Sequence, residues 1–259
     1  MTSFSIIKDI QQGLIDSIRF DLVWNKIQTN DKLNNKFRKI IKHNILMFVL
    51  PIILLWVIDN LFDVNLSYIY DYSKIIIGTV SGLFHLLYFF DIVDIVCIYA
   101  NKSNRLINKS NLISLTIIVF FFQMSVYLVM EIINFILNDK FPLVSTIVKF
   151  LILTIYHSFY CFNNLWHYKR VDFQSRINIH EKFWPYYFGY AVIVSILYLC
   201  SGYKIVTAFY NIYMTVCIII PFIIKTKYPH QQQSYPSINL KIFCWIVSFI
   251  QYIIHYLVN

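Results

Sequence analysis

The stretch that decides the fold covers residues 112–162 and reads LISLTIIVFFFQMSVYLVMEIINFIL, then NDK, then FPLVSTIVKFLILTIYHSFYCF. Each apolar run is long enough for a membrane helix, which needs ~20 residues, and only Asn138, Asp139 and Lys140 separate the two runs. Neither run alternates as a barrel strand does, and lipid accepts only helices or closed barrels. We therefore predict a helical hairpin, whose tip either reaches the far interface or turns back within the membrane.

Apolar stretches of this kind recur along the whole chain. Hydrophobic residues make up 58% of the sequence, its mean hydropathy is +0.60, and charged residues account for 14%, against about 25% in ordinary domains. These values predict an all-α, polytopic helical membrane protein with six or seven segments. A second hairpin, 183–224, has the short tip 201–204. The candidate segments are 45–61, 75–100, 112–137, 141–162, 183–200, 205–224 and 242–258.

The lysines and arginines are concentrated in four linkers. Residues 1–44 contain eight of them, and 101–111, 163–182 and 225–241 contain three, four and three. The other links contain only Lys74, Lys140 and Lys204. The positive-inside rule then places the N-terminus and the basic linkers in the cytosol. We expect a cytosolic arm at 1–44 and a transmembrane helical domain at 45–259; the side of the C-terminus stays open.

The arm has helical periodicity. Apolar residues recur every three or four positions, which predicts one apolar helix face lying on the membrane or packing on the bundle. The basic stretch 32–42 that follows is a topology signal or, alternatively, attracts anionic headgroups. The residues of the apolar face are Ile7, Ile10, Leu14, Ile18 and Leu22.

Ionisable side chains inside apolar segments are costly and therefore informative. Asp91 and Asp94 share a helix face, where they pair with basic loops or, alternatively, bind a cation or handle protons. Glu131 lies near a helix end, from which it reaches the interface, and Lys149 snorkels outward on its long stem.

Small residues predict one close helix contact. Gly78 and Gly82 form a GxxxG pattern, which predicts tight packing within the chain or, as the alternative, homodimerisation. The five cysteines include no CxxC and lie in or beside apolar runs, so we expect buried thiols.

The linker 163–182 carries the most concentrated polar residues near the membrane. Its cations are simply solvated or, alternatively, contact an anion or phosphate headgroup. His157, His167 and His180 have spacings that do not suit a metal site. The cations are Lys169, Arg170, Arg176 and Lys182.

No catalytic motif stands out in the sequence. Neither a nucleophile elbow, a P-loop, a dinucleotide fingerprint nor HExxH is present, so we expect no enzyme and no cofactor. Aromatic and basic residues mix only beside lipid-facing runs, which disfavours nucleic-acid binding.

Several short motifs resemble the etoposide-induced protein 2.4 family. Three stretches carry the likeness, together with a similar spacing over residues 240–255. They are Gly13-Leu14-Ile15-Asp16-Ser17-Ile18, Asp91-Ile92-Val93-Asp94-Ile95, and Tyr160-Cys161-Phe162 followed by Lys182-Phe183-Trp184-Pro185-Tyr186-Tyr187-Phe188-Gly189. The arginine-rich region that animal members carry before their first span is here a shorter lysine-containing stretch, and their extended C-terminal tail is absent.

The resemblance implies a non-enzymatic protein of the endoplasmic-reticulum membrane. It would act in autophagy, at autophagosome maturation and ER contacts, through lipids or through autophagy and ER proteins. The same superfamily includes the bacterial CysZ sulfate permeases, whose helical hairpins enter only part of the bilayer. The rival hypothesis is therefore a channel or transporter for sulfate or another small anion. Ligand, partners and oligomeric state are not predicted.

Overall fold

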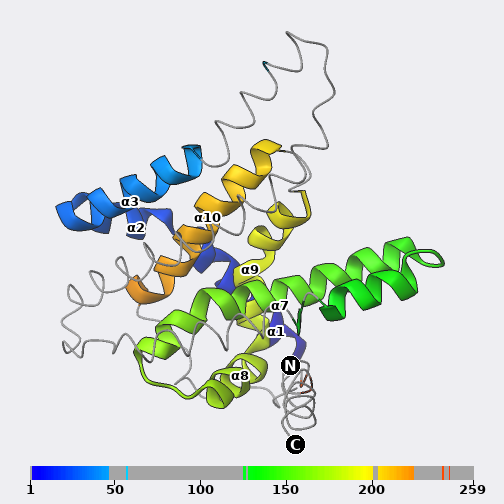
Figure 1. The fold of residues 1–259 in the computed structure, drawn as a ribbon. Coiled ribbons are helices and arrows are strands. Elements are labelled where there is room, and N and C mark those ends of the chain that lie inside the picture. The colour runs from blue at the N-terminus through cyan, green and yellow to red at the C-terminus, as the bar shows by residue number, and fades with distance from the viewer. Residues whose placement is uncertain are drawn as a thin grey trace, which may run out of the picture. The chain divides into compact units, whose positions relative to one another are not determined.

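The computed structural model describes residues 2–46, 57, 125–126, 128–200, 204–224, 241 and 245. Within these ranges the labelled elements are all α-helices, which confirms the predicted all-α class. The helices are α1 (Thr2–Ser17), α2 (Phe20–Gln28), α3 (Asp31–Asn44), α7 (Pro142–Tyr168), α8 (Phe173–Lys182), α9 (Trp184–Leu199) and α10 (Lys204–Ile223) (Figure 1).

The chain divides into two compact units. The first comprises Met1–Ile18, Arg105–Ser195 and Lys225–Asn259, and the second comprises Arg19–Asn104 and Ile196–Ile224. The division falls within the expected arm at Ile18, whereas the sequence suggested a boundary after residue 44. Helix α1 therefore folds with α7, α8 and most of α9, while α2 and α3 fold with α10.

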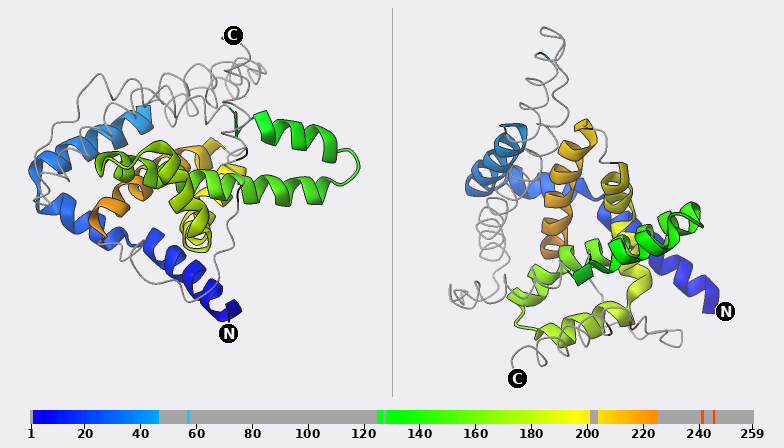
Figure 2. Two further views of the ribbon diagram at one scale, coloured as in Figure 1. Left: turned by 90° about the horizontal axis from the view of Figure 1, so that it is seen from below. Right: turned by 45° about the vertical axis from the view of Figure 1, so that its right-hand side comes forward.

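The predicted first hairpin is present in the described part of the first unit. A helix at Leu128–Leu137 and α7 are joined by a turn at residues 138–140, as the sequence predicts (Figures 1 and 2). Across the hairpin, the Ser145 hydroxyl donates a hydrogen bond to Asn134 Oδ1 at 3.1 Å. One turn further along α7, Lys149 Nζ lies 4.0 Å from Glu131 Oε1. These side chains brace the hairpin instead of pointing separately toward the interface.

Residues 163–182, expected to form a linker, are mostly helical. Helix α7 continues to Tyr168 and closes with a Schellman-type bond, in which the Val171 amide donates to the Trp166 carbonyl at 3.0 Å. Arg170 provides the left-handed residue this motif needs, with φ of 57°. Asp172 then caps α8, because its carboxylate accepts the Ser175 amide at 2.8 Å.

Replacing Arg170 by glycine should stabilise the protein. The left-handed conformation is strained for a residue with a Cβ, so Arg170→Gly should raise the unfolding free energy by roughly 0.5–1 kcal/mol. Denaturant titration in detergent micelles measures the change. Lys169→Gly is the matched control and should destabilise, because Lys169 does not have a positive φ.

The described part of the second unit contains a small helical assembly, in which α2 contacts α3 and α10. Asn30 begins α3, because its side-chain oxygen accepts the Leu33 amide at 3.2 Å. The ring of Phe20 meets that of Tyr213 edge-on at 5.4 Å. Apolar side chains spaced three or four apart on α2 and α3 form its core, and they are Val23, Ile27, Leu33, Phe37 and Ile40.

One described helix, Pro142–Trp166, is long and apolar enough to cross a membrane. Helix α9 and residues Ile212–Ile223 of α10 are apolar but shorter. The ends of α9 and α10 lie within one residue of the predicted segments 183–200 and 205–224, on either side of the predicted tip. Segment 75–100, all of 242–258 except Trp245, most of 45–61 and the first part of 112–137 lie outside the described residues. Gly78, Gly82, Asp91 and Asp94 lie outside them as well.

Candidate functional site

Helices α1 and α9 meet backbone to backbone at two glycines. A Cβ added to Gly13 would run into the Tyr186 carbonyl and would lie 2.8 Å from the Tyr190 amide nitrogen. A Cβ added to Gly189 would run into the Ile10 carbonyl and lie 2.7 Å from the Ile10 carbonyl carbon. The close approach is therefore reciprocal, and each helix needs its glycine at this point.

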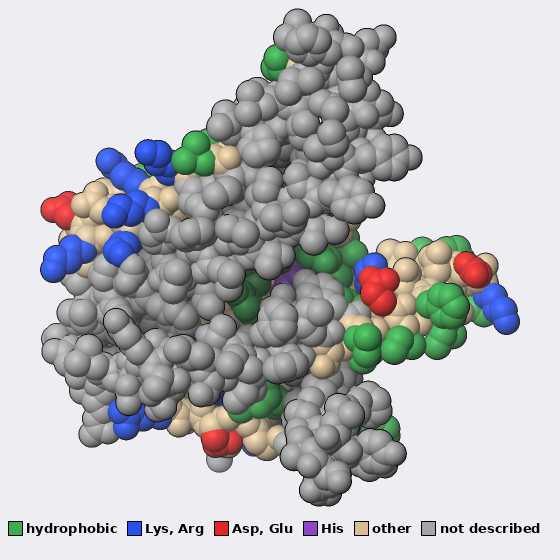
Figure 3. Space-filling view, viewed as in Figure 1, with side chains coloured by type: hydrophobic (Ala, Val, Ile, Leu, Met, Phe, Trp, Pro, Cys, Tyr) green, Lys and Arg blue, Asp and Glu red, His purple; other side chains and the backbone are tan. Residues whose placement is uncertain are grey.

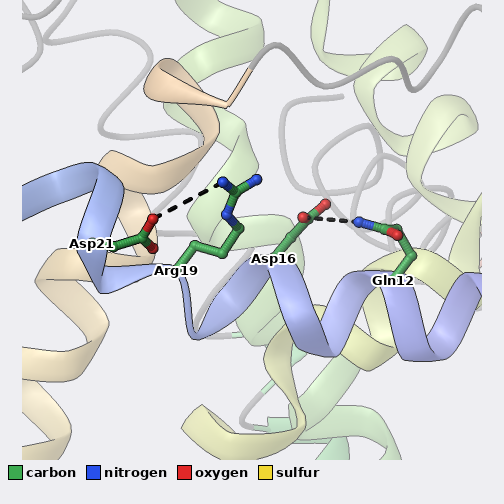
Figure 4. Close-up of polar contacts among 4 residues, drawn as sticks. All are labelled: Gln12, Asp16, Arg19 and Asp21. Carbon is green, nitrogen blue, oxygen red and sulfur yellow. Dashed lines mark hydrogen bonds and ion pairs between the residues drawn. The ribbon is translucent and has the colours of Figure 1, made fainter.

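A buried carboxylate joins the two helices beside this crossing. The Tyr186 hydroxyl donates a hydrogen bond to Asp16 Oδ2 at 3.0 Å. Gln12 Nε2 donates to Asp16 Oδ1, also at 3.0 Å (Figure 4). Asp16 is 6% exposed and Tyr186 is 1% exposed. Burying a carboxylate is costly unless hydrogen bonds satisfy it, and here two different donors reach its two oxygens.

The buried residues of α1 differ from the predicted apolar face, of which Ile10 and Leu14 are half-buried. Gly13, Asp16 and Ser17 are buried, whereas Ile7 and Ile18 are about half exposed. The predicted apolar face is also interrupted, because α1 ends at Ser17 and α2 begins at Phe20. Gly13, which has no side chain, fits against the backbone of α9. Asp16 accepts a hydrogen bond from the Tyr186 hydroxyl, which also lies on α9.

Aromatic rings from α7, α8 and α9 surround the crossing. Phe162 meets Tyr187 and Tyr190 edge-on at 4.9 Å each, and it meets Tyr186 at 6.1 Å. The three tyrosines are at most 2% exposed. The rings of Tyr186 and Tyr187 therefore lie in the core and not at the protein surface. Edge-to-face pairs of this kind add roughly 0.5–1.5 kcal/mol each beyond the area they bury.

Two histidines lie in the same core and bind serines. His157 Nδ1 lies 2.9 Å from Ser195 Oγ, and His180 Nε2 lies 2.8 Å from Ser158 Oγ. The His180 ring also stacks on Tyr187, with ring centres 4.7 Å apart. Burial lowers the pKa of His180 from 6.5 to about 3, so this ring is neutral at physiological pH. These contacts tie α7 to α8 and to α9.

The cations expected at a headgroup contact occupy different environments. Lys169, Arg170 and Lys182 are exposed, and Lys182 Nζ lies 5.6 Å from the centre of the Phe183 ring. Arg176, in contrast, is buried. Its Nη1 donates to Asn163 Oδ1 at 2.9 Å and its Nε donates to the Val171 carbonyl at 2.7 Å. Arg176 therefore fixes the start of α8 to the end of α7.

The charge of Arg176 is retained despite its burial. Desolvation lowers the pKa of its guanidinium from 12.5 to about 10, an effect partly opposed by Asp172. The pKa of Asp172 is in turn lowered, first by its hydrogen bonds to Ser175. Both groups are therefore ionised at neutral pH.

The structure brings together four of the residues singled out in the sequence, Gly13, Asp16, Tyr186 and Gly189. Ser17 is buried and its hydroxyl donates to the Leu14 carbonyl at 2.8 Å. The remaining described motif residues line or flank the aromatic core. Tyr160 is half-buried on α7 and Trp184 meets Phe188 at 6.4 Å. Pro185 occupies the first turn of α9, where a proline is well tolerated.

Sequence reasoning missed Gln12 and Ser158, and it named Phe162 only as part of a motif that resembles the family. Gln12 precedes Asp16 by four residues, a spacing that predicts a side-chain hydrogen bond and could have revealed it. Phe162 and Ser158 carry no such local signal. Cys161 and Cys217 are buried as expected, whereas Cys200 is exposed. Within the described residues, no three His, Cys, Asp or Glu side chains gather as metal ligands would.

The chemistry of this site is structural, because its polar groups hold helices together. The Asp16 carboxylate and the Ser158 hydroxyl are buried and engaged in hydrogen bonds. The fold and the site thus define an all-α protein whose helix crossing depends on glycine and on a buried aspartate–tyrosine bond.

The comparisons with known proteins identify a relative from a giant virus. Over 257 residues, the chain is 48% identical to Uncharacterized protein L211 of Acanthamoeba polyphaga mimivirus. The match covers 99% of this chain and 98% of the relative, so the chain belongs to the same family as L211. No protein-family model matches the chain, and no solved structure matches it.

The bond between Tyr186 and Asp16 should contribute measurably to stability. Tyr186→Phe removes one donor from a buried carboxylate and should lower the unfolding free energy by about 2 kcal/mol. Denaturant titration in micelles measures the loss. Tyr198→Phe is the matched control, since Tyr198 is only half-buried in α9, and it should cost much less. A Tyr186→Phe variant as stable as the wild type would contradict the assigned bond.

Proposed function

We propose that this protein is a non-enzymatic, polytopic membrane protein of the endoplasmic reticulum that acts in autophagy through lipids or protein partners. The observation that carries the proposal is the contact between Gly13-x-x-Asp16-Ser17 and the Trp184–Gly189 motif. These are two of the motifs that resemble the etoposide-induced protein 2.4 family, and they meet although they lie 170 residues apart. Motifs that build one helix crossing support a shared architecture.

Membrane insertion is supported by the surface of the first hairpin. Phe135 is 86% exposed and Leu143 is 73% exposed, and large apolar side chains lie along the hairpin toward its tip (Figure 3). A contiguous apolar surface of this kind is rare on water-soluble monomers and marks a membrane or protein contact. The other exposed apolar residues of the hairpin include Leu128, Ile132, Ile136, Phe141, Val144, Ile147 and Leu151.

Partial insertion of the hairpin is supported by the lengths of α7 and of its exposed part. Its 27 residues extend ~40 Å, more than the ~30 Å hydrocarbon core. From Phe141 to the pair formed by Lys149 and Glu131, the hairpin extends only ~12 Å. The exposed apolar surface continues to Leu151, ~15 Å from Phe141, which is still shorter than a full crossing, and residues 152–159 of α7 are buried in the protein.

Membrane integration is tested with alkaline carbonate. We expect the full-length protein, expressed in eukaryotic cells, to stay with the membrane pellet and to co-localise with the endoplasmic reticulum. Release into the carbonate supernatant would contradict the membrane assignment. Asp139→Cys then locates the tip, because labelling by an impermeant maleimide in sealed microsomes distinguishes a lumenal, a cytosolic and a membrane-embedded position.

The role in autophagy is tested separately. We expect autophagic flux to change when the gene is removed, or when it is expressed in a cell that lacks it. Tyr186→Phe should weaken this effect more than Tyr198→Phe. Unchanged flux with normal localisation would contradict the role in autophagy while leaving the membrane assignment intact. Sulfate flux into liposomes that contain the purified protein would instead favour the small-anion conduit.

A further inference from the structure

An apolar groove opens between the helices of the second unit. Its volume is about 390 Å³, within the ~300–1,000 Å³ range of small-molecule sites. Trp24 is 57% exposed and Phe20 is 43% exposed, so the aromatic lining is open to the surroundings. The apolar lining consists of Phe20, Val23, Trp24, Ile27, Phe37 and Val216.

One carboxylate also lines the groove. Asp21 is the charged lining residue, and its Oδ2 lies 4.0 Å from Nη2 of Arg19 (Figure 4). Both side chains are exposed, with 42% of Arg19 and 63% of Asp21 accessible, so the pair is solvated. The cation beside it reduces the repulsion that Asp21 would exert on an anion at the groove.

The helix that contributes Phe37 to the groove carries mostly positive charge. Residues 19–44 contain seven lysines and arginines but only two acidic residues, Asp21 and Asp31. Arg38 directly follows Phe37, and Lys42 lies one turn further on the same face as Arg38. Lysines and arginines gather over α3 in the space-filling view (Figure 3). The exposed cations of α3 are Lys32, Arg38, Lys39 and Lys42.

These two features fit an anionic amphiphile. An apolar groove lined by aromatic rings favours a hydrocarbon chain, and basic side chains near a membrane favour anionic headgroups. Exposed Trp24 is of the residue type enriched where the bilayer meets water. We propose that the groove between α2, α3 and α10 binds an anionic phospholipid, with an acyl chain against Phe20 and Trp24 and the headgroup at the α3 cations.

This inference goes beyond the proposed function, because it assigns a site that selects lipids by charge. The test uses purified full-length protein in mixed micelles of a nonionic detergent. The probes are phosphatidylserine and phosphatidylcholine analogues that carry a photoreactive diazirine on one acyl chain. Mass spectrometry of peptides then locates the covalent adducts.

We expect the phosphatidylserine probe to label peptides of α2 and α3 more strongly than the phosphatidylcholine probe. Arg38→Gln combined with Lys42→Gln should lower this labelling by about tenfold at low salt, and added salt should lower it in the wild type. The control combines Lys8→Gln with Lys140→Gln, two exposed cations outside this unit. It removes the same charge and should change the labelling less than about twofold.

Trp24→Ser tests the groove itself, since its exposed side chain contributes little to the core. We expect it to lower labelling at α2 while circular dichroism stays unchanged. Equal labelling by both probes, adducts confined to other helices, or equal losses in the Arg38/Lys42 and Lys8/Lys140 variants would each overturn the proposal. Dimers of the purified protein, detected by analytical ultracentrifugation, with no lipid adduct at α2, would show a protein contact and overturn it as well.

Discussion

Gly13→Val and Gly189→Val are each expected to prevent the first unit from reaching its native packing. At both positions a side chain would meet the backbone of the opposing helix, which has no flexible end that could move aside. The helices would have to separate, which would break the bond between Asp16 and Tyr186. We expect a loss of at least about 3 kcal/mol, at the upper end of overpacking costs. Thermal unfolding in micelles and the yield of monodisperse protein measure it.

Gln11→Val is the matched control for Gly13→Val. Gln11 is exposed on the same helix, so valine there introduces the same side chain without entering the crossing. Helix propensity alone would favour Gly13→Val over Gln11→Val, because valine is a better helix former than glycine and a poorer one than glutamine. Alanine at Gly13 should already be harmful, because the clash begins at Cβ. If Gly13→Val and Gln11→Val unfolded at the same temperature, the close approach of α1 and α9 would be contradicted.

The hairpin shows what local sequence can predict. Apolar runs on either side of Asn138, Asp139 and Lys140 leave only one place for a turn, and the turn lies there. The limits of α9 and α10 follow for the same reason, since the apolar pattern ends where the helices end. Backbone hydrogen bonding in an apolar run depends on neighbours within four residues, so it is readable from a short window.

The buried face of α1 depends on information that a short stretch of sequence does not contain. Periodicity selected Ile7, Ile10 and Ile18 as one apolar face, expected to lie on the membrane or to pack on the bundle. The face that packs instead contains Gly13 and Asp16, which suit α9 only because it presents Gly189 and Tyr186 there. The partner lies 170 residues away along the chain, and helical periodicity contains no information about it.

Arg176 and His180 were misread for a related reason. Both lie in a polar stretch, so the sequence suggested a solvated linker. Asp172 instead caps a helix, and that helix directs Arg176 toward Asn163 and His180 toward Ser158. A capping residue three positions before Ser175 was a readable signal, but burial of the charged face depends on the aromatic core contributed by α7 and α9.

The buried His180 should make the protein sensitive to mild acid. In the unfolded chain this imidazole takes up a proton near pH 6.5, whereas burial lowers its pKa in the folded protein to about 3. The unfolded state therefore binds more protons between these values, and stability falls as the pH falls through this window. The expected slope approaches 1.4 kcal/mol per pH unit, so about 2 kcal/mol should be lost between pH 7 and pH 5. Denaturant titrations in nonionic micelles across this range measure the slope.

His180→Gln separates this contribution from that of every other titrating group. Glutamine keeps an amide donor that can reach Ser158 Oγ but does not titrate, so its stability should depend less steeply on pH than that of the wild type. The buried His157, 2.9 Å from Ser195, is unchanged in both proteins and is therefore removed by taking the difference of the two slopes. Parallel slopes between pH 7 and pH 5 would mean that His180 is protonated in the folded protein, which would contradict its burial between Phe159, Trp166 and Tyr187.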